Sequence, residues 1–229
     1  MGIKEIKQRL LSGENVPAEE VLPLMPHKNC GLCGFKSCAQ LVDQLPHEPT
    51  ALNRCLFLEE HVLKSIDELR EPEDITYKDI LQREYDFVLD QFPQDPGPRE
   101  HIILSNPVNL ERLKIKRGDI LFGRPFPAGC PVQHVGVVVS EPDYFNGCFE
   151  WCIVGPQAAR ERGIDIGYYN NIAYQGLVHH TRVPLEFGRR YFFLPHFCML
   201  QVRHSGLINE IAKTNDGGYR VRLEGVWLS

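Results

Sequence analysis

Eight cysteines are the residues best suited to chemistry in this chain of 229 residues. Half of them lie close together in the first quarter of the chain, at Cys30, Cys33, Cys38 and Cys55. Their spacing is C-x2-C-x4-C-x16-C, and four thiolates at such spacing can hold one iron–sulfur cubane. Gly31 and Gly34 give the loop the backbone freedom to turn amide N–H groups toward the cluster sulfides, which would tune its potential. The pattern therefore predicts that these four cysteines bind a 4Fe-4S cluster.

Other uses of the four thiols stay open. A structural zinc site usually shows two close cysteine pairs, whereas Cys38 and Cys55 are separated by sixteen residues with no His-x3-5-His to replace a pair. A redox dithiol would use Cys30 and Cys33 and leave the other two without a role. A disulfide framework does not suit the reduced cytoplasm in which we expect this chain to act. We place the iron–sulfur interpretation first and zinc second.

The segment from Leu22 to Cys55 resembles a known module. Its Leu-Pro start, its Asn-Cys-x2-Cys-Gly-x3-Cys run and its fourth cysteine are similar to the 4Fe-4S module of the corrinoid iron–sulfur protein large subunit and of the B subunit of ion-translocating ferredoxin:NAD oxidoreductases. The resemblance, over residues ~22–60, implies that all four cysteines are cluster ligands. It departs from the family at Leu56, where proline is frequent, and at Ala39-Gln40, where Phe-Ala is usual. The rest of the chain differs from those proteins, so their full activities are not implied.

The surrounding sequence predicts an α+β protein: a small α-helical iron–sulfur module followed by a mostly β barrel- or sandwich-like domain. Residues 1–92 read as helical, with apolar side chains at helical spacing over Thr50–Leu69, which carries Cys55, and over Tyr77–Phe92. Three prolines and a glycine in Phe92–Pro98 favour a domain boundary there.

Residues 99–229 contain short β-branched and aromatic runs separated by glycine and proline, which predict strands. The expected strands are His101–Leu104, Asp119–Phe122, His134–Val139, Phe149–Val154 and Arg190–Leu194. Residues 215–218, Asn-Asp-Gly-Gly, predict the turn of a hairpin between Met199–Lys213 and Tyr219–Leu228. The segment Ala158–Asn171 reads as a loop.

The β domain offers candidates for a second site. Cys130 in a Gly-Cys-Pro turn could be a nucleophile with His134 as its base. His196 and Cys198 could point to one metal, whereas Cys148 and Cys152 would lie about 13 Å apart on one strand face. Core packing is the simpler role for these cysteines. The chain has no P-loop, G-x-G-x-x-G, G-x-S-x-G or H-E-x-x-H motif, so an enzymatic activity has little support from motifs.

Charge and hydropathy limit the remaining function classes. The formal net charge is −5, which disfavours nucleic acid as a partner. No apolar stretch approaches the roughly 20 residues of a membrane helix, and charged residues replace the apolar core of a secretion signal at the start, so we expect a cytoplasmic protein.

Residues 1–100 hold 11 basic and 19 acidic side chains, a net −8. We expect single-electron transfer in anaerobic metabolism, to or from a basic redox partner such as a metalloenzyme or a corrinoid protein. A redox-sensing or partner-binding adaptor with a structural cluster, and an enzyme with its site in the β domain, are the alternatives.

Overall fold

The structure is a computed structural model that describes all residues except 1, 32, 59–74, 127–128, 155–162 and 197. The chain forms two compact units, Met1–Ile75 and Thr76–Ser229. Their division lies before the Phe92–Pro98 segment in which the sequence predicted a boundary. The combination of a small helical unit with a β unit confirms the predicted α+β class.

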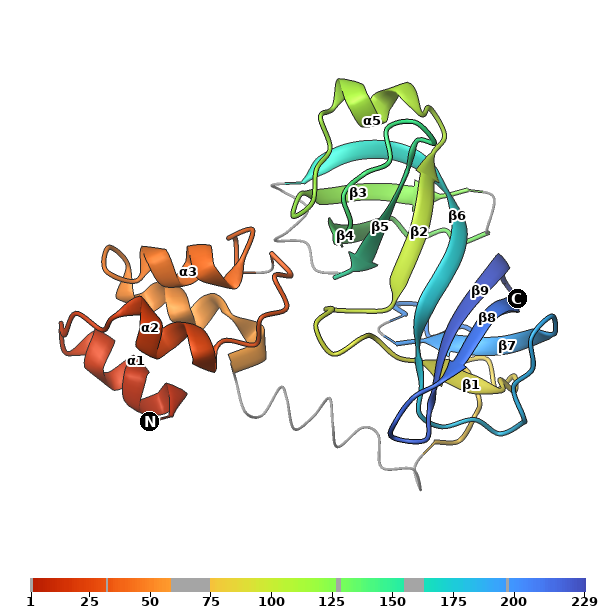
Figure 1. Cartoon of the computed structure of the whole chain (residues 1–229), viewed down its shortest axis with the longest axis horizontal. Helices are drawn as coiled ribbons and strands as arrows, with labels where there is room; N and C mark the ends of the chain where they lie inside the picture. The colour runs from red at the N-terminus through yellow and green to blue at the C-terminus, as the bar shows by residue number, and fades with distance from the viewer. Residues whose placement is uncertain (1, 32, 59–74, 127–128, 155–162, 197) are drawn as a thin grey trace. The chain divides into compact units, whose positions relative to one another are not determined.

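The first unit is built from short helices (Figure 1). In chain order they are α1 (Ile3–Leu11), α2 (Ala18–Val21), the 3-10 helix η1 (Leu22–Leu24), α3 (Cys38–Gln44) and the 3-10 helices η2 (Pro49–Arg54) and η3 (Leu56–Leu58). Ile6 and Leu10, one turn apart on α1, are buried in a core that also contains Leu41 and Leu52. The apolar face of each short helix is therefore stabilised by tertiary packing rather than by helix length.

The α-helix predicted over Thr50–Leu69 is wrong in its described part. Cys55 has extended dihedral angles, φ −80° and ψ 106°, between two 3-10 helices. This conformation interrupts the helical hydrogen bonds and turns the cysteine side chain into the core, where it is 6% exposed. Residues 59–69 lie outside the described part of the chain.

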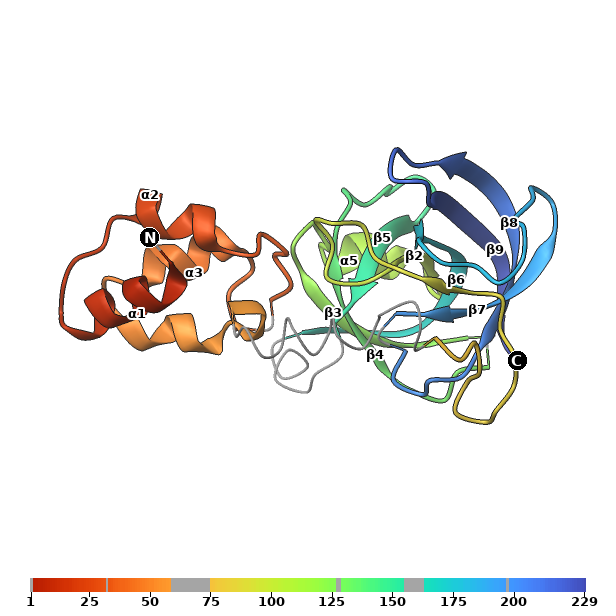
Figure 2. The same cartoon turned by 90° about the horizontal axis from the view of Figure 1, so that it is seen from below.

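The second unit is a nine-stranded sheet in which part of the sheet closes on itself. Its elements are β1 (Phe87–Leu89), β2 (Arg99–Leu104), α5 (Val108–Arg112), β3 (Ile120–Pro125), β4 (His134–Val138), β5 (Cys148–Ile153), β6 (Ile164–Val178), β7 (Arg190–Pro195), β8 (His204–Lys213) and β9 (Tyr219–Leu228). The order is β1-β7-β8-β9-β6-β2-β5-β4-β3, and a further parallel pairing of β3 with β6 closes β2 to β6 into a barrel. Figures 1 and 2 show these five strands curling around one another, with β7 to β9 beside them.

Two clusters of buried side chains stabilise this unit. Trp151, Tyr169 and Phe149 belong to the cluster inside the barrel. Phe87 and Phe193 belong to a second cluster on β1 and β6 to β9, and their rings stack at 5.8 Å. The 15-residue strand β6 contributes to both clusters and so joins the barrel to the other strands.

The expected strands and the final hairpin are confirmed, but two predictions here are wrong. The helix predicted over Tyr77–Phe92 is absent, because Phe87–Leu89 forms strand β1 and pairs in parallel with β7. The side chains alternate as in a strand: Phe87 and Leu89 are fully buried, and Val88 between them is half-buried. The loop predicted over Ala158–Asn171 is wrong from Ile164 onward, where the chain is part of β6, although many of its side chains are polar and several are exposed. Residues 158–162 lie outside the described part of the chain. Pairing with β3, β2 and β9 determines the conformation of this strand.

Within the described residues, no helix is both long and apolar enough to cross a membrane.

Candidate functional site

The four clustered cysteines of the first unit meet at one pocket. Cys30 and Cys33 reach the pocket from the loop before α3, and Cys38 is the first residue of α3. Cys55 lies between η2 and η3. Each of the four is between 6% and 9% exposed. Residues spread over 26 positions of the chain thus bring their thiols to a single, largely buried place.

Backbone conformation and one side chain shape the loop. Gly31 and Gly34 have φ of 72° and 94°, which glycine adopts readily, and the Gly34 N–H donates to the Gly31 carbonyl at 2.9 Å. Asn29 also has positive φ, 47°, which asparagine tolerates better than most residues. Its Oδ1 accepts from the Cys38 N–H at 2.8 Å and ties the start of the loop to the start of α3. The Ser37 Oγ caps that helix by accepting from the Gln40 N–H at 3.1 Å.

Cys55 reaches the pocket from a different part of the chain. Burial raises the pKa of its thiol to about 11, and the charges of Cys33 and Cys38 add to the rise. The backbone amides of Phe57 and Leu58 hydrogen bond to the sulfur and oppose the rise in pKa by favouring the thiolate. A cation bound in this pocket would displace the proton, because the thiolate is the form of cysteine that coordinates metal.

A single metal ion would need its ligands close together. Zinc–sulfur bonds of about 2.3 Å would bring neighbouring sulfurs of a tetrahedral site to about 3.8 Å. Within the described residues, no group of three or more Cys, His, Asp or Glu side chains is gathered closely enough to hold one metal ion. An iron–sulfur cluster places its own irons and sulfides between the cysteines and needs no such close approach. Lys28 also lines the pocket and supplies a positive charge beside a site that would be anionic when filled.

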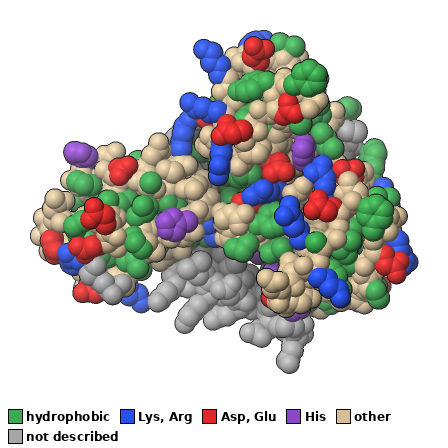
Figure 3. All heavy atoms as spheres, viewed as in Figure 1, with side chains coloured by type: hydrophobic (Ala, Val, Ile, Leu, Met, Phe, Trp, Pro, Cys, Tyr) green, Lys and Arg blue, Asp and Glu red, His purple; other side chains and the backbone are tan. Residues whose placement is uncertain are grey.

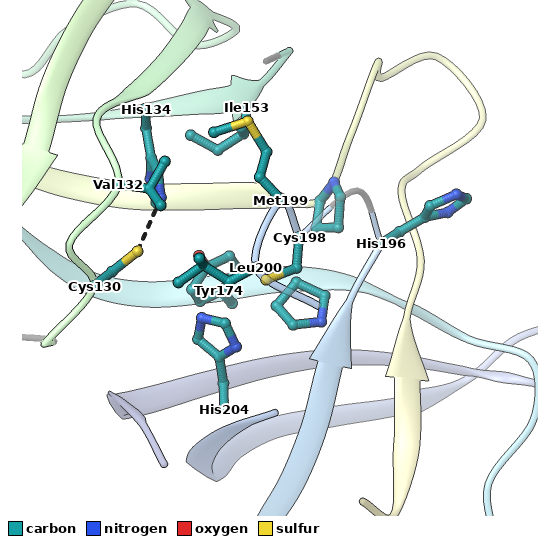
Figure 4. Close-up of a pocket in the computed structure, with 12 residues that line it drawn as sticks. Cys130, Val132, His134, Ile153, Tyr174, His196, Cys198, Met199, Leu200 and His204 are labelled. Carbon is teal, nitrogen blue, oxygen red and sulfur yellow. Dashed lines mark hydrogen bonds between the residues drawn. The ribbon is translucent and has the colours of Figure 1, made fainter. Parts of the chain in front are cut away.

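A second pocket lies in the β unit, and Figure 4 shows its lining. It brings together two of the residues that the sequence singled out, because Cys130 Sγ lies 3.6 Å from His134 Nε2. His196 and Cys198 also line it, but their side chains point apart in Figure 4. The His196 Nδ1 contacts Asp90 Oδ1 at 3.0 Å, and the Cys198 thiol donates to the Val202 carbonyl at 3.8 Å. The shared metal considered for this pair is not supported.

Cys148 and Cys152 both lie on β5, outside the residues that line this pocket. Cys152 is fully buried, which raises the pKa of its thiol well above the usual value. Cys148 is half-buried beside the turn at Asp143. Packing accounts for the position of Cys152.

The sequence analysis missed a buried carboxylate behind Cys130 and His134. Glu100 on β2 is 0% exposed. Its Oε2 accepts from Trp151 Nε1 at 2.8 Å and from the Tyr169 hydroxyl at 3.2 Å, and its Oε1 accepts from the Tyr174 hydroxyl. The Tyr169 oxygen also lies 2.6 Å from His134 Nδ1. Alternation along β2 was the available signal, because Glu100 occupies the same inward register as two buried aliphatic residues, Ile102 and Leu104.

Comparisons with known proteins bear on the first unit and on the whole chain. Residues 25–57 match a family described as "Putative Fe-S cluster". The chain is also 29% identical over 222 residues to "Uncharacterized protein MJ0119" of Methanocaldococcus jannaschii, an alignment that covers 93% of this chain and 94% of that protein. No solved structure matches. The family match supports the prediction of an iron–sulfur module in the segment that forms the first pocket.

Proposed function

We propose that the first unit binds one 4Fe-4S cluster through Cys30, Cys33, Cys38 and Cys55 and that the protein transfers single electrons. The observation that carries the proposal is the convergence of these four thiols on one pocket, inside the segment that matches an iron–sulfur family. When bound, such a cluster supplies reversible one-electron chemistry.

The residues around the pocket suit this role. The positive φ of Gly31 and Gly34 lets the loop turn tightly between its cysteines, while the Phe57 and Leu58 amides already point to the Cys55 sulfur. Amide hydrogen bonds to cluster sulfurs set the reduction potential, and burial of the ligands limits access of water. The pocket is therefore organised to tune a bound cluster as well as to hold it.

We propose a basic redox protein as partner, a metalloenzyme or a corrinoid protein. The first unit contains 8 Lys or Arg and 13 Asp or Glu, whereas the second contains 17 of each, so the net negative charge of the chain belongs to the first unit. On the face of the second unit in Figure 3, the two signs are interspersed. A net acidic unit steers a basic partner at low salt. Stopped-flow reduction of the partner should slow as ionic strength rises, and a rate indifferent to salt would exclude steering.

The test of cluster binding is anaerobic purification with iron and sulfide analysis, followed by a redox titration monitored by EPR. We expect about four irons and four sulfides per chain and a reversible one-electron signal. Cys38→Ala should lose the signal, whereas Cys148→Ala, a cysteine of the other unit, should retain it. A Cys38→Ala spectrum identical to that of the wild type would remove Cys38 from the ligand set. Loss of iron on each redox cycle would favour a structural cluster over an electron carrier.

A further inference from the structure

We propose that the β unit carries a second site, separate from the cysteine pocket of the first unit, in which Cys130 is a nucleophile toward the acyl carbon of an uncharged ester or thioester. His134 is its general base, and Glu100 orients His134 through Tyr169. The proposal goes beyond electron transfer and does not depend on the cluster.

The hydrogen bonds around His134 indicate which of its two ring nitrogens carries the proton. Trp151 Nε1 can only donate, and the Tyr169 and Tyr174 hydroxyls donate their single protons to Glu100. The Tyr169 oxygen can then only accept from His134 Nδ1, 2.6 Å away. With Tyr169 donating to Glu100, the neutral imidazole would carry its proton on Nδ1, and the lone pair of Nε2 would face Cys130 Sγ at 3.6 Å. This is the tautomer that a base for the thiol requires.

Burial keeps both partners neutral before reaction. It raises the pKa of Cys130 and lowers the pKa of His134, although Glu100 opposes the second shift. The titratable and charged side chains that act on the pair come from several elements: Glu100, Arg124, Tyr169, Tyr174, Cys198 and His204. The Val132 amide hydrogen bonds to the Cys130 sulfur and favours the thiolate. Proton transfer to His134 would give its ring a positive charge. Its Nδ1 lies 3.6 Å from Glu100 Oε1, so the carboxylate would stabilise the imidazolium.

The acylation step uses only these groups and the substrate. The Cys130 thiol proton moves to His134 Nε2 as a bond forms between Sγ and the acyl carbon. The bond from that carbon to the leaving oxygen or sulfur then breaks, and His134 returns the proton to the leaving group. The product is an acyl-Cys130 thioester, which water hydrolyses with His134 again as base, so no oxidation or reduction occurs.

The pocket indicates the substrate class. Among its described lining residues none is Lys, Arg, Asp or Glu. Its polar groups are three histidines, Tyr174 and two cysteines, and burial lowers the pKa of His134 and His204, which favours their neutral forms. Half of the lining is aliphatic: Pro98, Val132, Ile153, Pro195, Met199 and Leu200. Cys130 itself is 9% exposed and lies at this wall. An apolar acyl chain fits such a surface.

A metal site is the competing use of the same pair. Two ligands of one tetrahedral zinc ion would also place sulfur and nitrogen about 3.6 Å apart. In the described part of the chain, however, no third Cys, His, Asp or Glu completes such a site. A thiol and an imidazole without further ligands are better suited to nucleophilic chemistry.

The test uses p-nitrophenyl butyrate on the anaerobically purified, cluster-containing protein at pH 7. Release of p-nitrophenolate gives the acylation rate, and peptide mass spectrometry locates the butyryl group. We expect the butyryl group on Cys130, and at most one per chain, in samples quenched before water hydrolyses the thioester. His134→Gln should slow acylation by about 100-fold at pH 7, the usual contribution of a general base. Its remaining reaction should increase with pH as the Cys130 thiolate forms.

Cys148→Ala is the control, because Cys148 lies on β5 outside the residues that line this pocket. It should acylate at the wild-type rate. Tyr169→Phe tests the positioning residue and should change the pH profile, because His134 Nδ1 loses its acceptor. The Cys38→Ala protein should still acylate Cys130, which separates failure of this proposal from failure of cluster binding.

Three results would overturn the proposal. Acylation spread evenly over the cysteines would show that Cys130 has no special reactivity. A His134→Gln rate equal to that of the wild type would remove the base. Metal bound in addition to the cluster iron and lost in Cys130→Ala would assign the pair to a metal site. Cys130→Ala must keep the wild-type melting temperature for its loss of reaction to count as support.

Discussion

Replacement of Glu100 by glutamine should strongly destabilise the β unit. The carboxylate is fully buried and accepts hydrogen bonds from Trp151, Tyr169 and Tyr174. A glutamine amide has one acceptor oxygen instead of two, so its NH2 group must face a hydroxyl that donates to Glu100 in the wild type. The substitution thus changes the hydrogen bonding of a site that has no access to water.

The magnitude follows from the three bonds. A hydrogen bond to a charged group contributes about 1.5–3 kcal/mol and a neutral one about 0.5–1.5 kcal/mol, so the two bonds that remain each weaken by about 1 kcal/mol. The third donor, which loses its acceptor, adds about 1–3 kcal/mol. We expect a total loss of about 3–5 kcal/mol in the free energy of unfolding. In a unit of roughly 150 residues this lowers Tm by about 6–20 °C.

Tryptophan fluorescence during thermal unfolding measures this effect selectively, because both tryptophans of the chain, Trp151 and Trp227, lie in the β unit. Glu210→Gln is the matched control. Its side chain on β8 is 49% exposed and lies 3.8 Å from Arg220, and such a surface pair contributes at most about 1 kcal/mol. Equal melting temperatures for the Glu100→Gln and Glu210→Gln proteins would refute the buried carboxylate network.

Three further predictions concern pH, packing and cluster retention. Burial lowers the pKa of His204 to about 4, so the histidine of the unfolded chain binds a proton at higher pH than that of the folded chain. The free energy of unfolding of the β unit should therefore fall by up to about 3 kcal/mol as pH falls from about 6.5 to 4. Urea unfolding of the His204→Gln protein should show a weaker pH dependence. Gly136→Ala should lower stability by about 1–3 kcal/mol in the same assay, because its Cβ would lie 2.5 Å from the Trp151 ring. Asn29→Ala should release iron faster to a chelator, because the Cys38 N–H loses its acceptor.

Each of these predictions has a control and a contradicting outcome. His179→Gln removes an exposed histidine and should leave the pH dependence intact; an equal change in both histidine variants would exclude His204 as the cause. Gly2→Ala meets no atom within 4 Å and lies in the first unit, so it should leave the unfolding of the β unit unchanged. An equally unchanged Gly136→Ala protein would contradict the close approach to Trp151. Asn29→Asp keeps the acceptor and should retain iron, whereas iron loss equal to that of Asn29→Ala would show that the hydrogen bond is not responsible.

The features predicted correctly from the sequence were local ones. Short apolar and β-branched runs located β2 to β5 and β7, and the Asn-Asp-Gly-Gly turn located the hairpin of β8 and β9. The four cysteines line one pocket, which their spacing favours because three of them lie within nine residues and glycines supply the turns between them. Their role as cluster ligands stays a prediction. In each case neighbours in the sequence determine the geometry.

The features that were missed depend on distant pairing. Phe87 and Leu89 lie on β1 because a strand more than 100 residues later pairs with it, and the apolar spacing of that segment equally suited a helix. Likewise, β6 is a strand through its partners, since its polar residues gave no alternation to detect. The Glu100 network joins residues 51 to 74 positions apart. No local pattern encodes such contacts.

The eight cysteines show how surroundings, rather than residue type, determine what a thiol can do. Cys152 and Cys130 are both buried on the β unit, and burial raises the pKa of each. Cys152 lies on β5 outside the residues that line the β-unit pocket, and burial in apolar surroundings makes its thiol unreactive. Cys130 has an imidazole acceptor at 3.6 Å and an apolar pocket before it, so the same burial holds a neutral thiol ready to transfer its proton when a substrate arrives. The cysteines of the first unit line one pocket together, and the ligand that suits them is one that several thiolates bind at once.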